Sequence, residues 1–133
     1  MITTQDLAWV AGFLEGEGSF CFQGRRWDEP IAAKRGKRGG ARIQCPQVQR
    51  EPLERLQKLF GGGIYRINRG VNHRPINSWN LSGPMAVGVM MTVFQLMSPQ
   101  RKEQIKSALK HWGAWRMARS TWGIYGENST TSC

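Results

Sequence analysis

Apolar residues follow two different periods along this chain. In some segments they recur every three to four residues, which is typical of an amphipathic helix. In others they alternate with polar residues, which is typical of a strand with one buried face. The helical pattern predicts one helix after Thr3, a second from Glu51, a third from Pro84 and a last from Ser98–Pro99. The alternating pattern predicts strands over residues 19–25, 42–47, 64–69 and 76–81.

The same periods separate a buried side from an exposed side in each element. The expected core residues are Leu7, Val10, Ala11, Leu14, Phe20, Phe22, Ile43, Cys45, Leu53, Leu56, Leu59, Phe60, Tyr65, Ile67, Trp79, Leu81, Val87, Met90, Met91, Phe94, Met97, Ile105, Leu109 and Trp112. The element order predicts an α+β fold, in which a four-stranded antiparallel sheet carries helices on one face. Its other face is then polar and basic.

The length of 133 residues suits a single domain. We expect residues 1–115 to form it and the Ser/Thr-rich tail, 116–133, to be partly frayed.

The net charge of +10 changes the picture, because so one-sided a balance suggests a polyanionic partner, and nucleic acid is the default. An anionic membrane surface is the competing interpretation, but no long apolar run or basic amphipathic helix supports it. Three cysteines without metal-type spacing indicate free thiols in a reducing compartment. No signal peptide is recognisable, so we expect an intracellular protein of the prokaryotic cytoplasm or nucleoid, or of an organelle matrix.

The end of the first helix carries the candidate chemistry. Ala8, Gly12 and Gly16 lie four residues apart and form a stripe almost free of side chains, where another helix could approach closely. Glu17 follows at the helix C-terminus, where the dipole disfavours a carboxylate unless a cation is present. A divalent metal would relieve that cost, and a solvated glutamate in a glycine-rich turn is the plain alternative.

The segment Val10-Ala11-Gly12-Phe13-Leu14-Glu15-Gly16-Glu17-Gly18 resembles the nine-residue signature of the LAGLIDADG homing endonucleases. It departs from that signature by Glu for Asp at both acids, Val10 for Leu and Gly16 for Ala. The resemblance implies the αββαββα fold of that family and two motif helices packed together at the small-residue stripe. Because the chain has one motif copy, it implies a homodimer on a long, roughly palindromic DNA target.

The resemblance also implies roles for particular residues. Glu17 would hold Mg²⁺ (or Mn²⁺) together with the Gly16 carbonyl, and Gln47 would be the polar residue near the active site. A basic residue close to the phosphate would come from the last helical region, where Arg101 and Lys102 both remain candidates. The implied dimer interface consists of Ala8, Ala11, Gly12, Glu15 and Gly16.

Polar residues on the exposed side of the sheet are the expected DNA contacts. Those on the strands, whose side chains suit base edges in the major groove, are Ser19, Gln23, Arg25, Arg42, Gln44, Arg66, Asn68, Ser78 and Asn80. Those in the basic segment 26–40, which suit the phosphate backbone, are Lys34, Arg35, Lys37 and Arg38.

The sequence therefore predicts a metal-dependent, site-specific endonuclease that hydrolyses phosphodiester bonds in double-stranded DNA. A non-cutting binder of the same fold, either an intron RNA maturase or a DNA-binding regulator, is the alternative. A basic ribosome- or RNA-associated structural protein is a third interpretation, but it leaves the small-residue stripe unexplained.

Overall fold

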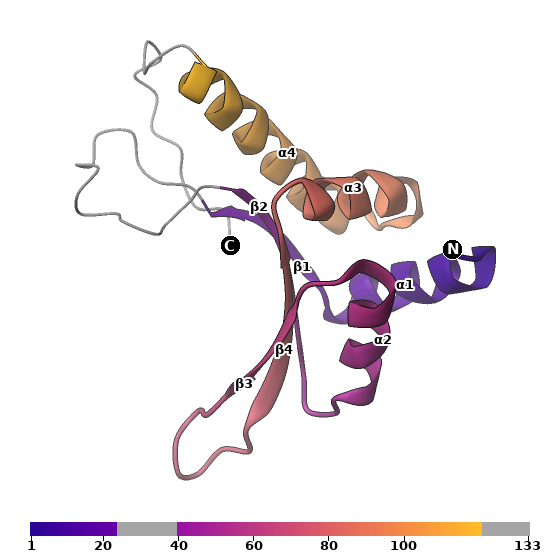
Figure 1. Cartoon of the computed structure of the whole chain (residues 1–133), viewed down its shortest axis with the longest axis vertical. Helices are drawn as coiled ribbons and strands as arrows, with labels where there is room; N and C mark the ends of the chain where they lie inside the picture. The colour runs from indigo at the N-terminus through magenta and orange to yellow at the C-terminus, as the bar shows by residue number, and fades with distance from the viewer. Residues whose placement is uncertain (24–39, 121–133) are drawn as a thin grey trace.

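The computed structural model describes residues 1–23 and 40–120 of the chain (Figure 1). The elements follow in the order α1 (Thr4–Glu17), β1 (Ser19–Gln23), β2 (Gly40–Gln47), α2 (Glu51–Phe60), β3 (Gly63–Ile67), β4 (Ile76–Ser82), α3 (Pro84–Val93), the short 3-10 helix η2 (Phe94–Leu96) and α4 (Pro99–Ser120). The expected order of helices and strands is confirmed. The last helix continues beyond residue 115, where we expected the domain to end.

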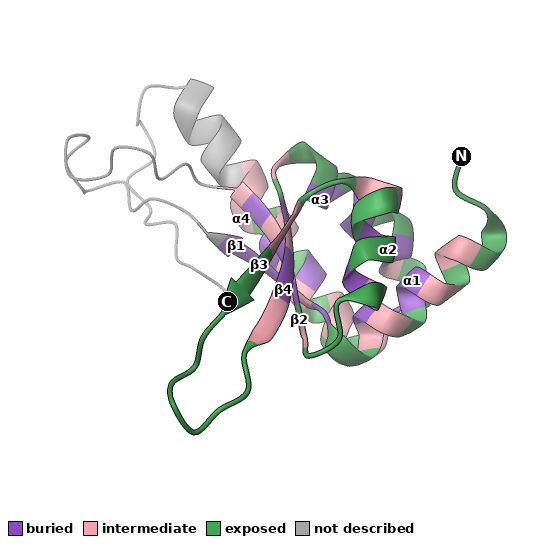
Figure 2. Ribbon diagram, turned by 60° about the horizontal axis from the view of Figure 1, so that its bottom comes forward, coloured by how far each residue is buried: buried purple, intermediate pink, exposed green. Residues whose placement is uncertain are grey.

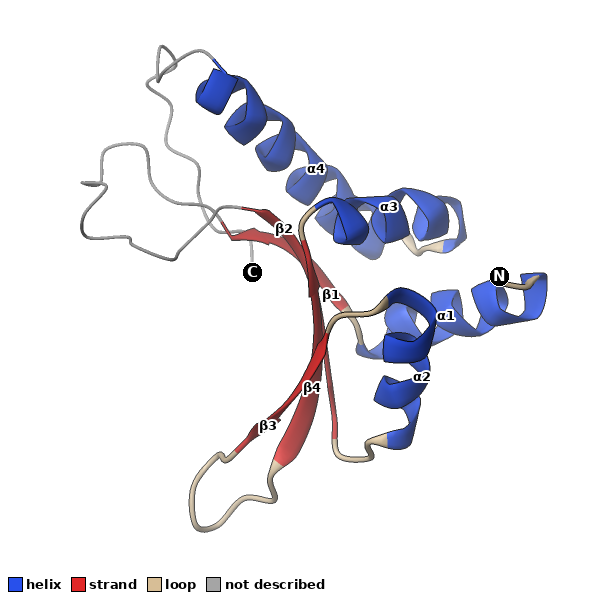
Figure 3. Ribbon diagram, in the orientation of Figure 1, coloured by secondary structure: helices blue, strands red, loops and turns tan. Residues whose placement is uncertain are grey.

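The strands form one four-stranded antiparallel sheet in the order β1-β2-β4-β3. The helices lie along one side of this sheet, and its other side carries no helix of the described chain (Figure 3). The predicted α+β architecture is therefore confirmed. Strands β1 and β3 are the two edges, and the β3–β4 hairpin projects past the helices.

Local signals at α1 explain where this helix begins and ends. The Thr3 hydroxyl accepts from the Asp6 N–H at 3.0 Å, and the Asp6 carboxylate accepts from the Thr3 N–H at 3.1 Å, which completes a capping box. At the other end Gly18 is extended, with φ −85 and ψ 162. Neither Gly16 nor Gly18 therefore has the left-handed backbone that often ends a helix. Gly18 is needed for space, because a Cβ there would lie 2.9 Å from the Leu14 side chain.

The glycine turn after α2 fixes how the chain enters β3. Gly61 and Gly62 both have positive φ, at 82° and 87°, which side chains rarely allow. The Trp79 indole N–H donates to the Gly61 carbonyl at 2.9 Å, and a Cβ on Gly62 would lie 2.6 Å from the Asn80 carbonyl oxygen. The turn is thus pressed against β4.

The core lies between the sheet and its helices (Figure 2). Most predicted core positions are buried or half-buried. Met91 is an exception, with 65% of its surface exposed. It follows Met90 on a helix buried on one face only.

Two more expectations are corrected at the cysteines and at β3. Cys45 is a free, buried thiol as expected, but Cys21 is disulfide-bonded, so the expectation of free thiols is wrong for Cys21. Tyr65 and Ile67 are 57% and 42% exposed, whereas Ile64 packs against the core. The predicted phase of β3 is therefore shifted by one residue.

Candidate metal site and nucleic-acid interface

Glu17 is placed where the helix layer meets the edge of the sheet. It is the last residue of α1, and Gly18 alone separates it from β1. Its side chain is exposed, and in the described part of the chain no hydrogen bond or ion pair engages it. A carboxylate at a helix C-terminus without a cation is unfavourable, so this group is suited to a positively charged ligand.

Residues from two other elements approach Glu17. Burial raises the pKa of the Cys45 thiol to about 12; the negative charge of Glu17 adds to that rise, and the positive charge of Arg101 opposes it. Both charges therefore lie close to Cys45 on β2. The fold brings the end of α1, the middle of the sheet and the first turn of α4 together, although they are far apart in sequence.

The structure distinguishes the two basic candidates on α4. The Arg101 Nε donates to the Glu15 carbonyl oxygen at 3.0 Å, and its Nη1 donates to Gln104 Oε1 at 3.0 Å. Only 18% of its side chain is exposed. Lys102 points elsewhere, with its Nζ 5.7 Å from the centre of the Phe94 ring. Arg101 is therefore the basic residue fixed beside the end of α1.

Glu15 connects α1 to the beginning of α4. Its carboxylate accepts from the Ser98 backbone N–H at 2.6 Å and from the Ser98 hydroxyl at 2.8 Å. These hydrogen bonds, with the charge of Arg101, hold the pKa of Glu15 below its usual value. We expected Glu15 near a partner helix, and its carboxylate is engaged within its own chain.

Gln47, the remaining catalytic candidate, lies at the end of β2 and not beside Glu15 and Arg101 in any described hydrogen bond. It lies opposite Asn77, and its side-chain oxygen accepts from the Val48 N–H at 2.9 Å. In the described chain no hydrogen bond connects it to Glu17 or Arg101. Its catalytic role stays a prediction.

The stripe on α1 is open on the surface of the chain. Ala8, Gly12 and Gly16 are exposed, and a Cβ on either glycine would meet nothing within 4 Å. Ala11, which we also assigned to the interface, is buried in the core of its own chain. The exposed part of the predicted interface is therefore the small-residue stripe itself.

The free face of the sheet displays most of the polar residues expected there. Because directly paired residues of antiparallel strands share a face, Ser19 lies beside Gln44, which lies beside Asn80. Arg42 and Ser78 share this face, and the Ser78 hydroxyl donates to Asn80 Oδ1 at 3.1 Å. Ser78 itself is buried, so the polar surface that can contact base edges consists of the half-buried Ser19, Arg42, Gln44 and Asn80.

Strand β3 departs from this scheme, and the expected DNA contacts Arg66 and Asn68 are affected. Ile64 pairs with the buried Trp79, so Arg66, which pairs with Asn77, lies on the helix side of the sheet. Asn68 follows the end of the strand. The placement of Arg66 on the free face is wrong, and that of Asn68 stays a prediction. The sequence missed Tyr65 and Ile67, which occupy that face instead.

Several expected DNA contacts cannot be placed. Gln23 belongs to β1, but its side chain lies outside the described structure. Also outside the described residues are Arg25, Lys34, Arg35, Lys37 and Arg38.

The described residues of one chain do not supply a complete set of side-chain ligands for a metal. Over residues 1–23 and 40–120, no three His, Cys, Asp or Glu side chains come together at metal-binding distance. Glu17 offers one exposed carboxylate with backbone carbonyls at the helix end, and such oxygen ligands suit Mg²⁺.

Within the same residues, no helix is both long enough and apolar enough to cross a membrane.

Comparison with solved structures identifies the fold. One similar structure is that of the homing endonuclease I-CvuI in complex with the I-CreI target, in the presence of Mg and with the DNA not cleaved. It superposes on this chain with a TM-score of 0.66 and 17% identity, over 90% of this chain and 73% of that chain. The intron-encoded homing endonuclease I-CeuI bound to DNA gives 0.66 and 14%, over 91% of this chain and 60% of that chain. The meganuclease I-SmaMI bound to DNA gives 0.59 and 19%, over 92% of this chain and 42% of that chain.

The chain therefore has the fold of the LAGLIDADG homing endonucleases, and the resemblance expected from the motif is confirmed at the level of the fold. No protein-family model and no curated protein matches the sequence.

Proposed function

We propose that this chain is a site-specific DNA endonuclease of the LAGLIDADG type that acts as a homodimer with Mg²⁺ or Mn²⁺. The observation that carries the proposal is Glu17, an exposed carboxylate at the end of the motif helix, which no hydrogen bond or ion pair engages among the described residues. A protein that only binds DNA has no need for a carboxylate close to phosphate groups, because like charges repel.

The homodimer follows from the number of carboxylates. Each chain supplies one Glu17, and the hydrolysis of both DNA strands needs a carboxylate at each of two sites. Packing of two α1 helices along Ala8, Gly12 and Gly16 would bring both copies of Glu17 to the two-fold axis. A two-fold symmetric protein matches a roughly palindromic target.

In this proposal each residue of the site has a distinct task. The metal, when bound, supplies an activated water and stabilises the charge that develops on the scissile phosphate. Glu17 and the Gly16 carbonyl would hold that metal. Arg101 would place a positive charge beside it, positioned by the Glu15 backbone carbonyl and by the Glu15 carboxylate 3.9 Å from its Nε. The free face of the sheet would read the target sequence in the major groove.

Cleavage of a random DNA library tests the proposal. The wild-type protein is incubated with the library in Mg²⁺ and, in parallel, in EDTA, and the cut ends are sequenced. We expect Mg²⁺-dependent cuts at one related set of sites with approximate two-fold symmetry. Selective binding without cuts would instead identify the non-cutting binder, and absence of any sequence selection would reject both.

A further inference from the structure

The free face of the sheet is apolar at its end nearest the β3–β4 hairpin. Directly paired residues of antiparallel strands share a face, so Ser78 lies between Pro46 and Tyr65. Ile67 and Ile76 form a pair on the same face, closer to the hairpin. Of these residues Pro46, Tyr65 and Ile67 are exposed, and Ile76 is half-buried. We refer to Pro46, Tyr65, Ile67 and Ile76 as the apolar end of the free face.

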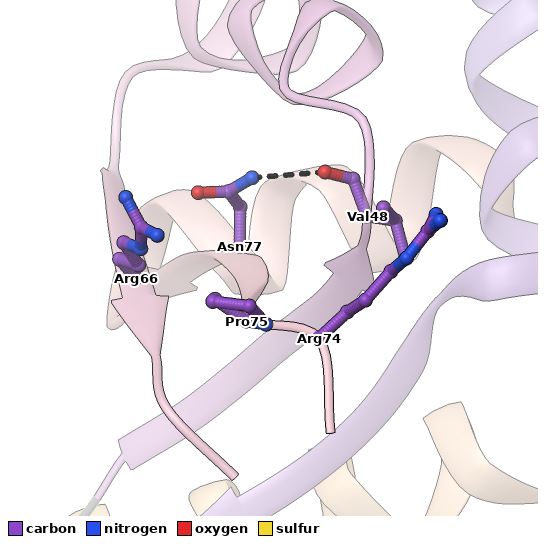
Figure 4. A pocket seen from close by; sticks show the side chains of 5 residues that line it. All are labelled: Val48, Arg66, Arg74, Pro75 and Asn77. Carbon is purple, nitrogen blue, oxygen red and sulfur yellow. Dashed lines mark hydrogen bonds between the residues drawn. The ribbon is translucent and has the colours of Figure 1, made fainter. Parts of the chain in front are cut away.

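Strand β3 reverses the usual arrangement of a strand with one face in water, which buries its apolar residues and exposes its polar ones. Its charged residue, Arg66, pairs with Asn77 on the helix side of the sheet, where both line a pocket (Figure 4). Tyr65 and Ile67 lie on the side that carries no helix of the described chain (Figure 3). The packing of Ile64 against the core fixes this phase, so the fold itself holds two large apolar side chains outward.

The ring of Tyr65 lies along its strand, over Gly63. A Cβ on Gly63 would lie 2.6 Å from the Tyr65 hydroxyl oxygen and 2.8 Å from its Cζ, so the ring occupies space that only a glycine leaves open. Gly63 pairs with Asn80, which belongs to the polar surface of the free face. The apolar end is therefore continuous with that polar surface.

Basic residues follow the apolar end in the hairpin. The hairpin carries Arg69 and Arg74, and the Arg69 guanidinium donates to the Arg74 carbonyl at 3.1 and 3.3 Å. The sequence has no Asp or Glu over residues 61–82. Single exposed apolar residues are ordinary, but a group of them on one face marks a contact surface. A polyanion with apolar groups among its polar ones fits a contact surface in this setting.

We propose that the apolar end of the free face contacts thymine methyl groups in the major groove, so that Tyr65 and Ile67 select A·T pairs in each half-site. The 5-methyl group of thymine is the apolar group that base edges offer there. The inference rests on the proposed function for the presence of DNA on the free face. It adds a preference that the polar residues do not supply, because their side chains read hydrogen-bonding atoms.

Replacement of single thymines by uracil tests this inference, because dU differs from dT only by the missing methyl group. Each dT of the target that the wild type selects is replaced in turn by dU, and affinity is measured in EDTA so that no strand is cut. At one or more thymines of each half-site, the wild type should bind about four-fold more weakly for each methyl group removed. Tyr65→Thr and Ile67→Thr should each bind dT and dU equally at the position that the residue contacts. Threonine keeps the β-branched character that suits a strand.

Met91→Gln is the matched control, since Met91 is an exposed apolar residue on α3, on the helix side of the sheet. This variant should keep the difference between dT and dU at every position.

Three results would overturn the inference and leave the proposed nuclease standing, because the readout is binding and not cutting. The first is a wild type that binds dT and dU equally at every position. The second is a difference that persists in both Tyr65→Thr and Ile67→Thr, and the third is a selected target whose half-sites contain no thymine. A wild type that selects no DNA sequence at all would overturn the proposed function, and this inference with it.

Discussion

A single methyl group at Gly12 can show whether the face of α1 is an interface. Gly12 lies in the interior of α1 and is exposed in the chain. A Cβ at this position would meet nothing within 4 Å. The change Gly12→Ala therefore adds a methyl group that only a partner molecule could touch.

The sign of the stability change depends on that partner. In a chain on its own, alanine in place of glycine in a helix interior stabilises by about 0.8–1 kcal/mol. For a domain of this size that raises the melting temperature by roughly 2–5 °C. In a dimer packed along this stripe, a methyl group forced into a tight contact costs typically ~1–3 kcal/mol. The net effect then becomes destabilising.

Gly88→Ala is the matched control. Gly88 is also exposed within a helix, α3, and a Cβ there also meets nothing within 4 Å. We expect Gly88→Ala to raise the melting temperature and Gly12→Ala to lower it. Melting should be followed at several protein concentrations, because the stability of a dimer depends on concentration. In Gly12→Leu an isobutyl group fills the space beside Gly12, so sedimentation of this variant should show a monomer or an insoluble protein.

One result would refute this reasoning. If Gly12→Ala and Gly88→Ala stabilise the protein equally, and sedimentation of Gly12→Leu shows an unchanged dimer, the face of α1 is solvent-exposed and the interface lies elsewhere. A monomeric wild type would remove the second copy of Glu17 as well, and with it the proposed mechanism.

Three further predictions concern the site. Glu17→Gln should abolish cleavage and leave target affinity within about a few-fold, since the change is nearly isosteric; Mg²⁺-dependent nicking by this variant would contradict the metal assignment. Glu15→Ala and Arg101→Ala should each slow single-turnover cleavage with little effect on affinity, and their effects should not add, because the Glu15 carboxylate lies 3.9 Å from the Arg101 Nε and acts through this arginine; additive losses would separate the two roles. The Cys45 thiol, with a pKa of about 12, should resist alkylation by iodoacetamide at pH 8 until the protein unfolds, and mass spectrometry of the native protein would show otherwise if the thiol is accessible.

The pH dependence of stability gives one more test. The pKa of Glu15 is lowered from 4.5, so its contribution to stability is fully present above pH 4.5 and is lost as the pH falls through the lower, folded pKa. Urea unfolding of Glu15→Gln should therefore show less loss of stability in this acid range than the wild type. An identical acid profile for both proteins would mean that the Ser98 hydrogen bonds do not matter for folding.

The sequence by itself determined the elements and their order, because the signals involved are local. The capping box at Thr3 and Asp6, the proline at the start of α3 and the glycines after α2 each act within a few residues. The alternation of Ile43 and Cys45 with Arg42 and Gln44 likewise depends only on the two-residue period of a strand. The acidic motif was readable for the same reason, since it is one continuous segment.

The phase of β3 could be decided only by the tertiary structure. Apolar residues stand at Ile64, Tyr65 and Ile67, so the pattern permits either side to be buried. Strand β4 determines which side is buried, because the Gly61–Gly62 turn packs against Trp79 and places Ile64 opposite that ring. A shift of one residue moves every side chain of a strand to the other face.

The hydrogen-bond partners of the site residues could not be predicted from the sequence either. Glu15 and Ser98 are far apart in the chain, and nothing local indicates that the Glu15 carboxylate would accept hydrogen bonds from the N–H and the hydroxyl of Ser98, just before α4. A second contact, from the Arg101 Nε to the Glu15 backbone carbonyl, distinguishes Arg101 from Lys102, because consecutive residues of a helix point about 100° apart and only one of them can face that carbonyl. The motif supplies the carboxylate that makes metal chemistry possible, and the packing of α4 against α1 and β1 decides which charge stands beside it.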